Sequence, residues 1–263
     1  MSAATTPTVV LERMESVATI RIDRPRALNA LDELTLRDLA RAVRDVRRDA
    51  GIHCVLVTGS GPKAFCAGAD IAAMASMSAL AGQAYSALGH EVFGRLAALD
   101  VPVVAAVNGA ALGGGLELTL ACDFVVASDQ ARLGLPETTL GLIPGFGGTQ
   151  RLALRIGVAK ARELIYLGRV IDAGEALRIG LVDRVVAADQ LMPEAARLAA
   201  ELAGRAPVAL RQAKRLVGAA AQAVIAAALA HEVDAFATTF ASEDRSEGLR
   251  AFLEKRAPVW KGR

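Results

Sequence analysis

The chain has 263 residues and a net charge of +2, from 30 basic and 28 acidic side chains; 53% of its residues are hydrophobic and 4% are aromatic. This length suits one large domain with a substantial core, and the abundance of small apolar residues favours packed α/β layers over a β-sandwich. The balanced charge argues against a protein that coats nucleic acid or another polyanion.

Cysteine usage indicates a reducing compartment. Cys54, Cys66 and Cys122 are odd in number, lack CxxC spacing and lie in apolar surroundings. Such residues are expected to be reduced, buried thiols rather than a disulfide framework or a zinc site. The sequence therefore predicts a cytoplasmic protein.

Other functional classes lack their signatures. His53, His90 and His231 are isolated from one another and from acidic or thiol clusters, so no metal site is expected. The motifs HExxH and GxSxG and the P-loop signature are absent. The first ten residues do not resemble a signal peptide, and no apolar run approaches the roughly 20 residues that span a bilayer. No membrane association is expected.

Two alternating segments open the chain. Residues 8–13 and 17–22 alternate apolar and polar side chains and are expected to form an antiparallel hairpin. After the irregular segment 24–29, Asn29 and Asp32 are candidate caps for a helix. The apolar side chains of that helix share one stripe, as in a helix that covers a sheet: Leu36, Leu39, Ala40, Val43 and Val46.

A buried strand at residues 54–58 follows this helix and completes a βαβ unit. The next segment, residues 64–71 (AFCAGADI), is a loop of small residues in which Gly68 and Ala69 leave backbone amides accessible. The alternative is an ordinary tight turn that leads into a helix over residues 74–99.

The rest of the chain is organised around residues 101–117, VPVVAAVNGAALGGGLE. The apolar run predicts a buried parallel strand, and consecutive glycines let the backbone approach a ligand: Gly113, Gly114 and Gly115. A helix predicted at residues 116–122 would place the last glycine amides at its positive end, where they suit a developing oxyanion. Glu117 is a costly residue in the first turn of this apolar helix unless it is used. A carboxylate that only complements the helix dipole, or a flexible glycine turn, would explain the same residues.

A second carboxylate and a second glycine-rich loop come next. A strand is predicted at residues 123–127, and an extended piece at residues 130–137 ends at Glu137. A solvated turn is the ordinary place for such a Glu. Residues 143–151 (IPGFGGTQR) form a glycine-rich loop that opens a helix. A phosphate-binding loop is the alternative, but the Lys-Ser/Thr ending is missing.

The last part of the chain is mainly helical. Helices are predicted at residues 159–167 and 172–179, a strand at 182–186, and Ala-rich helices beyond Leu191, with breaks at 204–207 and 243–247. We therefore divide the chain into an α/β core, residues 1–200, and a helical region, residues 201–263. Such a helical region would expose apolar surface in a monomer, so an oligomer is expected.

Two amide-bearing loops and two carboxylates, with no nucleophile or metal site, indicate proton transfer beside a stabilised enolate. A thioester conjugated to a double bond can accept water at its β-carbon under two conditions. The charge on the carbonyl must be held, and protons must be delivered and removed on one face. Glu117 and Glu137 are sufficient for that proton transfer.

At these residues the chain resembles the enoyl-CoA hydratase/isomerase (crotonase) family. The motifs occur in the family's order and spacing, from about Val17 to the C-terminus: AFCAGADI, AVNGAALGGGLEL, LPETTLGLIPGFGGTQRL and EDRSEGLRAFLEKR. The resemblance implies an α/β fold, a spiral of ββα units followed by a C-terminal helical region that makes homotrimers, usually paired into hexamers. It also implies an enoyl-CoA hydratase that converts a 2-enoyl-CoA to the 3-hydroxyacyl-CoA and needs no cofactor, since coenzyme A is part of the substrate.

The resemblance carries over to individual residues. The amides of Ala69 and Gly114 match the family's oxyanion hole, and Glu117 and Glu137 match its two catalytic carboxylates. The positions that match substrate and CoA contacts are Arg26, Ala27 and Leu28 near the nucleotide, Gly68, Asp70, Ile71 and Ala72 around the first amide donor, Gly145 beside the second acid, and Phe252 and Lys255, which reach the CoA of a neighbouring subunit.

Some features depart from this pattern or suggest a different branch. The family often has Lys where Ala72 stands, so one phosphate or adenine contact is missing. The segments GGGLELTLACD, ELIYLGRVIDAGEA and LEKRAPVWKGR also resemble the branched-chain methylglutaconyl-CoA hydratases. Two further hypotheses are a Δ3-Δ2 enoyl-CoA isomerase, which uses related chemistry, and a non-catalytic acyl-CoA or RNA binder. The presence of both acids argues against the binder, and the near-neutral charge argues against RNA.

Overall fold

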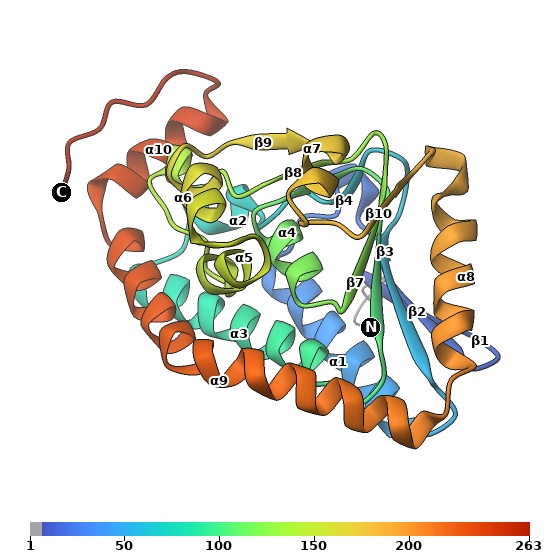
Figure 1. The fold of residues 1–263 in the computed structure, drawn as a ribbon. Coiled ribbons are helices and arrows are strands. Elements are labelled where there is room, and N and C mark those ends of the chain that lie inside the picture. Colours follow the sequence, from blue (N-terminus) through green and yellow to red (C-terminus); the bar gives the residue numbers. More distant parts are fainter. Residues whose placement is uncertain (1–6) are drawn as a thin grey trace, which may run out of the picture.

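Two sheets form the framework of the fold, which the computed structural model describes for residues 7–263, apart from the side chains of residues 220–222 (Figure 1). Within this range the larger sheet has the order β1-β2-β3-β5-β7-β10: β1 (Val9–Met14), β2 (Val17–Ile22), β3 (Cys54–Gly59), β5 (Val103–Val107), β7 (Phe124–Ser128) and β10 (Arg184–Val186). The smaller sheet has the order β4-β6-β8-β9: β4 (Ala64–Cys66), β6 (Ala110–Leu112), β8 (Arg132–Gly134) and β9 (Val170–Asp172). The predicted β1–β2 hairpin is confirmed, whereas β9, antiparallel to β8, was not expected.

The chain forms a spiral because it alternates between the two sheets. β3 leads into β4, β5 into β6 and β7 into β8, so each turn places one strand in the larger sheet and the next strand in the smaller one. Gly109 makes the step from β5 to β6 possible, since a Cβ there would lie 2.4 Å from the backbone oxygen of Lys63. The predicted α/β spiral of ββα units is confirmed.

Helices cover the sheets on both sides (Figure 1). They are α1 (Glu33–Arg48), α2 (Ile71–Ala75), α3 (Ala79–Ala97), α4 (Gly114–Leu120), α5 (Gly148–Ile156), α6 (Val158–Tyr166), α7 (Ala173–Arg178), α8 (Leu191–Ala203), α9 (Pro207–Phe240) and α10 (Glu243–Leu253), with short 3-10 turns η1 (Pro25–Ala27), η2 (Glu137–Leu140) and η3 (Ala188–Gln190). The long helix α9 packs along α3, and α10 packs against η2. This arrangement brings the C-terminal helices next to the second predicted acid.

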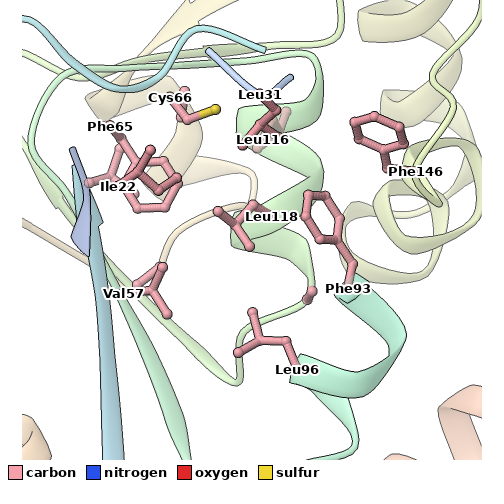
Figure 2. Packing of buried hydrophobic residues seen from close by; sticks show 14 of the residues in the cluster. Ile22, Leu31, Val57, Phe65, Cys66, Phe93, Leu96, Leu116, Leu118 and Phe146 are labelled. Carbon is pink, nitrogen blue, oxygen red and sulfur yellow. The ribbon is translucent and has the colours of Figure 1, made fainter. Parts of the chain in front are cut away.

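Alternation along the strands divides the buried residues between two layers. In β3, Val55 and Val57 face the main core, whereas Cys54 and Leu56 face α8. Successive side chains of a strand point to opposite faces, so a strand buried on both sides reads as a continuous apolar run. Figure 2 shows the main core, in which Phe93 lies close to Phe146.

The structure differs from the prediction in the role of Asn29 before α1 and in the place where α3 starts. Asp32 caps α1 by accepting the Thr35 amide at 2.8 Å, as predicted. Asn29 is not a cap: it is fully buried and donates to the carbonyls of Ser60 and Ala64. The helix predicted over residues 74–99 is interrupted, because Ser78 accepts the Ala81 amide and starts α3 as a new helix.

The predicted break at residues 204–207 is confirmed, but the second break lies earlier than predicted. Ser242 caps α10 by accepting the Arg245 amide, with Glu243 and Asp244 in the first turn, so this acidic segment begins a helix. Among the described residues, Ala223–Phe240 of α9 is long and apolar enough to cross a membrane by composition, although no such run was expected. This stretch packs against α3 and α5 within the fold.

Candidate active site

A cavity of about 60 Å³ lies beside the smaller sheet, where the predicted motifs meet. Its polar lining comes from the backbone of residues 67–69, from Gly113 and Gly114, and from the side chains of Glu117 and Glu137. Apolar side chains complete the wall: Ile71, Met74, Tyr85, Leu142, Ile143, Phe146 and Phe236. Segments far apart in the sequence thus share one site.

The first amide loop presents the N–H of Ala69. A single parallel bridge joins Leu31 and Ala69, in which Leu31 donates to the Gly68 carbonyl at 2.8 Å and Asp70 donates to the Leu31 carbonyl at 2.7 Å. Because this pattern uses the groups on either side of Ala69, the amide of Ala69 itself points away from Leu31. Ala69 also lines the cavity, so its N–H is available to a ligand.

The second amide loop presents the N–H of Gly114 at the start of α4. Gly113 has φ +50°, and Gly114 is the first helical residue, whose amide has no acceptor within the helix. The two loops are in contact: a Cβ on Gly68 would lie 3.6 Å from the Gly114 nitrogen and 2.9 Å from the Leu112 oxygen. Both predicted amide donors therefore lie along one wall of the cavity.

Glu117 is held by the second glycine-rich loop. Its side chain is 1% exposed, and Oε1 accepts the amides of Phe146 at 2.8 Å and Gly148 at 2.7 Å. Glycine is required at position 148, since a Cβ there would lie 2.7 Å from the same Oε1. Both hydrogen bonds go to one oxygen, which leaves Oε2 for a water or substrate.

Glu137 reaches the cavity from η2, and its carboxyl group has few hydrogen-bond partners in the described part of the chain. A Cβ on Gly113 would lie 2.7 Å from its Oε1, so the carboxyl group lies directly against the second amide loop. Its Oε2 is buried and has no hydrogen-bond partner among the described residues. Burial is the main cause that raises the pKa of Glu137 to about 8.

The two acids affect each other's protonation. Burial, followed by the nearby charges of Glu137 and Glu232, raises the pKa of Glu117 well above its usual value, although the Phe146 and Gly148 amides act in the opposite direction. Two carboxyl groups that share a buried site titrate as a pair. The amides favour the negative charge on Glu117, and the lack of partners favours the proton on Glu137.

Aromatic side chains close the cavity on the side of α3. The ring of Phe146 packs edge-on against Tyr85 at 5.2 Å and Phe93 at 5.5 Å between centroids. The Tyr85 hydroxyl donates to the Leu31 carbonyl at 2.6 Å, which fixes that ring. Gly89 leaves the space that Phe146 occupies, because a Cβ there would lie 2.1 Å from its ring.

The residues predicted to bind CoA do not all reach this cavity. Gly68, Ile71 and Gly145 line it. Arg26 and Leu28 border a separate hollow of about 250 Å³ together with Lys63, and Ala27 lies between them in η1.

Asp70 and the C-terminal pair lie elsewhere. The Asp70 carboxylate caps α2 through the Ala73 amide and pairs with Arg24 at 3.1 Å, and Ala72 is exposed on α2. Phe252 and Lys255 are exposed at the end of α10 and do not line the cavity of their own chain. Their contact with a neighbouring subunit stays a prediction.

One buried acid next to the cavity was not predicted from the sequence. Glu232 on α9 is 3% exposed and accepts the amides of Gly147 and Thr149. Its sequence signal is its spacing from Phe236 and Phe240, which puts an acid on the buried stripe of an apolar helix. Among the described residues, no three histidine, cysteine or acidic side chains are placed to hold a metal ion together.

The cysteines are free thiols, as predicted. Cys54 and Cys66 are buried, whereas Cys122 is partly buried. Burial raises the pKa of Cys54 and of Cys66 to about 12. A thiol with such a pKa is not a nucleophile near neutral pH, and neither Cys54 nor Cys66 lines the cavity.

The spiral fold, the two amide loops and the paired carboxyl groups around one cavity define an enzyme of the crotonase type. The sequence profile of the enoyl-CoA hydratase/isomerase family matches residues 12–263, and the chain belongs to this family.

Individual relatives agree with this assignment. The chain is 45% identical to a crotonyl-CoA hydratase of Syntrophomonas wolfei over 248 residues, which cover 94% of this chain and 95% of that protein. It is 39% identical to a 2,3-dehydroadipyl-CoA hydratase of Escherichia coli, with 97% and 99% coverage. The crystal structure of carnitinyl-CoA hydratase from Mycobacterium avium matches with a TM-score of 0.90 at 38% identity, over 98% of this chain and 100% of that chain.

Proposed function

We propose that this enzyme is an enoyl-CoA hydratase, a hydro-lyase, that adds water reversibly across the 2,3 double bond of a short-chain 2-enoyl-CoA to give the 3-hydroxyacyl-CoA. The observation that carries the proposal is the unequal hydrogen bonding of two carboxyl groups at one cavity. Glu117 accepts two backbone amides, while the Oε2 of Glu137 is buried without a partner in the described chain. Such a pair supplies a base and an acid at the same pH.

The thioester carbonyl oxygen accepts hydrogen bonds from the backbone amides of Ala69 and Gly114. These N–H groups stabilise the negative charge that this oxygen gains as the double bond is attacked. A water held between the two carboxyl groups loses a proton to Glu117 as its oxygen bonds to the β-carbon, and the π electrons move to the carbonyl oxygen. Glu137 then delivers a proton to the α-carbon from the same side, so the elements of one water are added syn.

The size and lining of the cavity favour a short, uncharged acyl chain. The cavity has a volume of about 60 Å³, and the aromatic rings of Tyr85, Phe146 and Phe236 form part of its wall. None of the described residues that line it is basic, so a methylglutaconyl group would bring its second carboxylate to a place without a counter-ion. Two of the relatives are named crotonyl-CoA hydratase and short-chain-enoyl-CoA hydratase.

The rest of the substrate and the assembly belong to the same proposal. The hollow beside Arg26, Leu28 and Lys63 suits the CoA nucleotide, since it combines cationic side chains with an apolar edge. The exposed apolar side chains at the end of α10, Phe252 and Leu253, suit contact between subunits of a trimer or a hexamer. The free thiols suit a cytoplasmic location.

The test is hydration of crotonyl-CoA, followed by the loss of absorbance of the conjugated thioester. Glu137→Gln is expected to lower kcat by at least ~10²-fold, since a positioned acid or base contributes that much. The matched control is Glu201→Gln on the exposed face of α8, which should keep wild-type activity. Gly114→Pro removes one amide donor and should cost a comparable factor.

Three results would overturn this assignment. Wild-type hydration by Glu137→Gln would remove that acid from the reaction. Turnover of a 3-enoyl-CoA or of methylglutaconyl-CoA far above crotonyl-CoA would favour an isomerase or a branched-chain hydratase. Absence of hydratase activity together with a steeply salt-dependent RNA affinity would favour a binding protein.

A further inference from the structure

Glu232 is a third buried carboxylate at this site, on a helix that contributes neither of the two acids already described. Its Oε1 accepts the Gly147 amide at 2.5 Å, and its Oε2 accepts the Thr149 amide at 3.0 Å and the Thr149 hydroxyl. The Nε2 atom of His90 lies 3.1 Å from Oε1. Oε1 thus accepts one backbone amide and Oε2 accepts one amide and one hydroxyl, so both oxygens of the carboxylate are fixed in place.

The amides of residues 146–149 alternate between two carboxylates. Phe146 and Gly148 donate to Glu117, while Gly147 and Thr149 donate to Glu232. Gly147 has φ +103°, a conformation that other residues rarely adopt, and this turns successive amides to opposite sides. Because neighbouring peptide planes share a Cα, fixing the amides on one side restricts the directions of the amides on the other.

We propose that Glu232 is a positioning residue of the active site: it holds the Gly147 and Thr149 amides so that the Phe146 and Gly148 amides fix the Glu117 carboxylate in its reactive orientation. This inference rests on the proposed hydratase reaction. Glu232 does not line the cavity, so it acts through the loop rather than on the substrate.

Packing alone does not account for an acid at this position. Glu232 shares a buried stripe of α9 with Ile225, Phe236 and Phe240, where an apolar side chain would avoid the desolvation of a charge. The loop is also held from its other side, since Arg151 donates to the Phe146 carbonyl at 2.9 Å. An acid at this position supplies acceptors that an apolar side chain lacks, because two amides and one hydroxyl converge on it.

Glu232 also affects the protonation of the acid pair. The charged and titratable groups around it are His90 from α3, Arg151 from α5, Glu117 from α4 and Glu137 from η2. Its negative charge raises the pKa of Glu117 and of Glu137. Removal of that charge is therefore expected to shift both limbs of the pH–rate profile to lower pH.

The test compares Glu232→Gln with a chemically matched control. Asp38 on α1 is also a buried carboxylate that accepts the backbone amide and the hydroxyl of one threonine, Thr8, but it lies outside the cavity. Glu232→Gln is expected to lower kcat for crotonyl-CoA by ~10-fold or more, with KM changed less than ~3-fold, because misplacing a catalytic group affects the reaction more than binding. Asp38→Asn should lower Tm and leave kcat and the pH profile unchanged.

Two further measurements keep the test decisive. If Glu232→Gln does not fold, Thr149→Val keeps the Thr149 amide and removes its hydroxyl, which donates to Glu232 and accepts from Gln150 Nε2. This variant should lower kcat a few-fold at constant KM. If the wild-type protein hydrates no enoyl-CoA, the proposed function fails, and carboxyl 13C NMR titration of the Glu117 and Glu137 signals still tests the effect of Glu232 on them. Wild-type kcat and pH profile in a folded Glu232→Gln protein, or unshifted carboxyl titrations, would overturn the inference.

Discussion

Glu117 and Glu247 are both nearly buried carboxylates, 1% and 8% exposed, and each accepts a hydrogen bond from a backbone amide. Their environments nevertheless shift their pKa values in opposite directions. Burial and neighbouring acids raise the pKa of Glu117 well above its usual value. Hydrogen bonds from Arg256 and Arg250 hold the pKa of Glu247 well below its usual range. Burial alone therefore does not identify a reactive acid; the sign of the neighbouring charges does.

The difference distinguishes a carboxylate with a proposed chemical role, Glu117, from one with a structural role, Glu247. Glu247 binds both Arg256 and the Val259 amide, so it fixes the segment after α10. Asp244 fixes the end of the same segment through the amides of Lys261 and Gly262. Burial and the charges of Glu137 and Glu232 disfavour the charge on Glu117 more than the two amides favour it, and the raised pKa that results makes a carboxylate a stronger base.

The largest expected effect is that of Glu117→Gln. Hydration of crotonyl-CoA should fall by at least ~10²-fold, because the base is lost. The amide oxygen of Gln can still accept the Phe146 and Gly148 amides without a buried charge, so Tm measured by calorimetry should stay constant or rise. A variant that is unfolded, or fully active, would contradict the comparison.

Gly148→Ala should have the next largest effect. The new Cβ would lie 2.7 Å from Oε1 of Glu117 and must displace it, so kcat should fall by ~10-fold or more. Gly94→Ala on α3 is the matched control, because a Cβ there meets nothing within 4 Å. That substitution should leave kcat unchanged and stabilise the helix by up to about 1 kcal/mol.

The two regions should also give opposite dependences of stability on pH. The pKa of Glu137 is about 8 in the folded chain and 4.5 without the fold, so the folded state binds its proton more tightly. The free energy of unfolding should therefore fall as the pH rises from about 4.5 to 8, and Glu137→Gln should flatten that slope. Chemical denaturation at several pH values measures it; an equal slope in the variant would exclude Glu137 as its source.

Glu247→Gln should have the smallest effect, and on stability alone. The pKa of Glu247 lies below its usual range in the folded chain, so its contribution is complete above pH 4.5 and is lost as the pH falls further. We expect the variant to lose a few degrees in Tm at pH 7 and almost nothing in strong acid, while kcat stays at the wild-type value. Loss of activity in a folded variant would assign this cluster a role beyond fixing the C-terminal segment.

Local patterns were sufficient for most of the framework and for singling out the two acids that we propose to be catalytic. Apolar runs and glycine breaks located β3, β5 and β7, and the placement of Glu117 and Glu137 in apolar surroundings marked them as unusual. Asn29 was assigned as a cap because its real partners, the carbonyls of Ser60 and Ala64, are more than 30 residues away. Glu232 was not identified for the same reason, since it accepts a hydrogen bond from a residue 83 positions earlier. Periodicity reports which face of a helix is buried but not what that face meets.

The placement of Glu232 and Phe236 one helical turn apart on α9 has a consequence for the newly synthesised protein. A nascent chain that ends before this helix already contains both reactive acids and both amide donors, yet it lacks one wall of the acyl cavity and the anchor of the glycine loop. We therefore expect turnover to begin only after α9 has been synthesised and has packed against the rest of the fold.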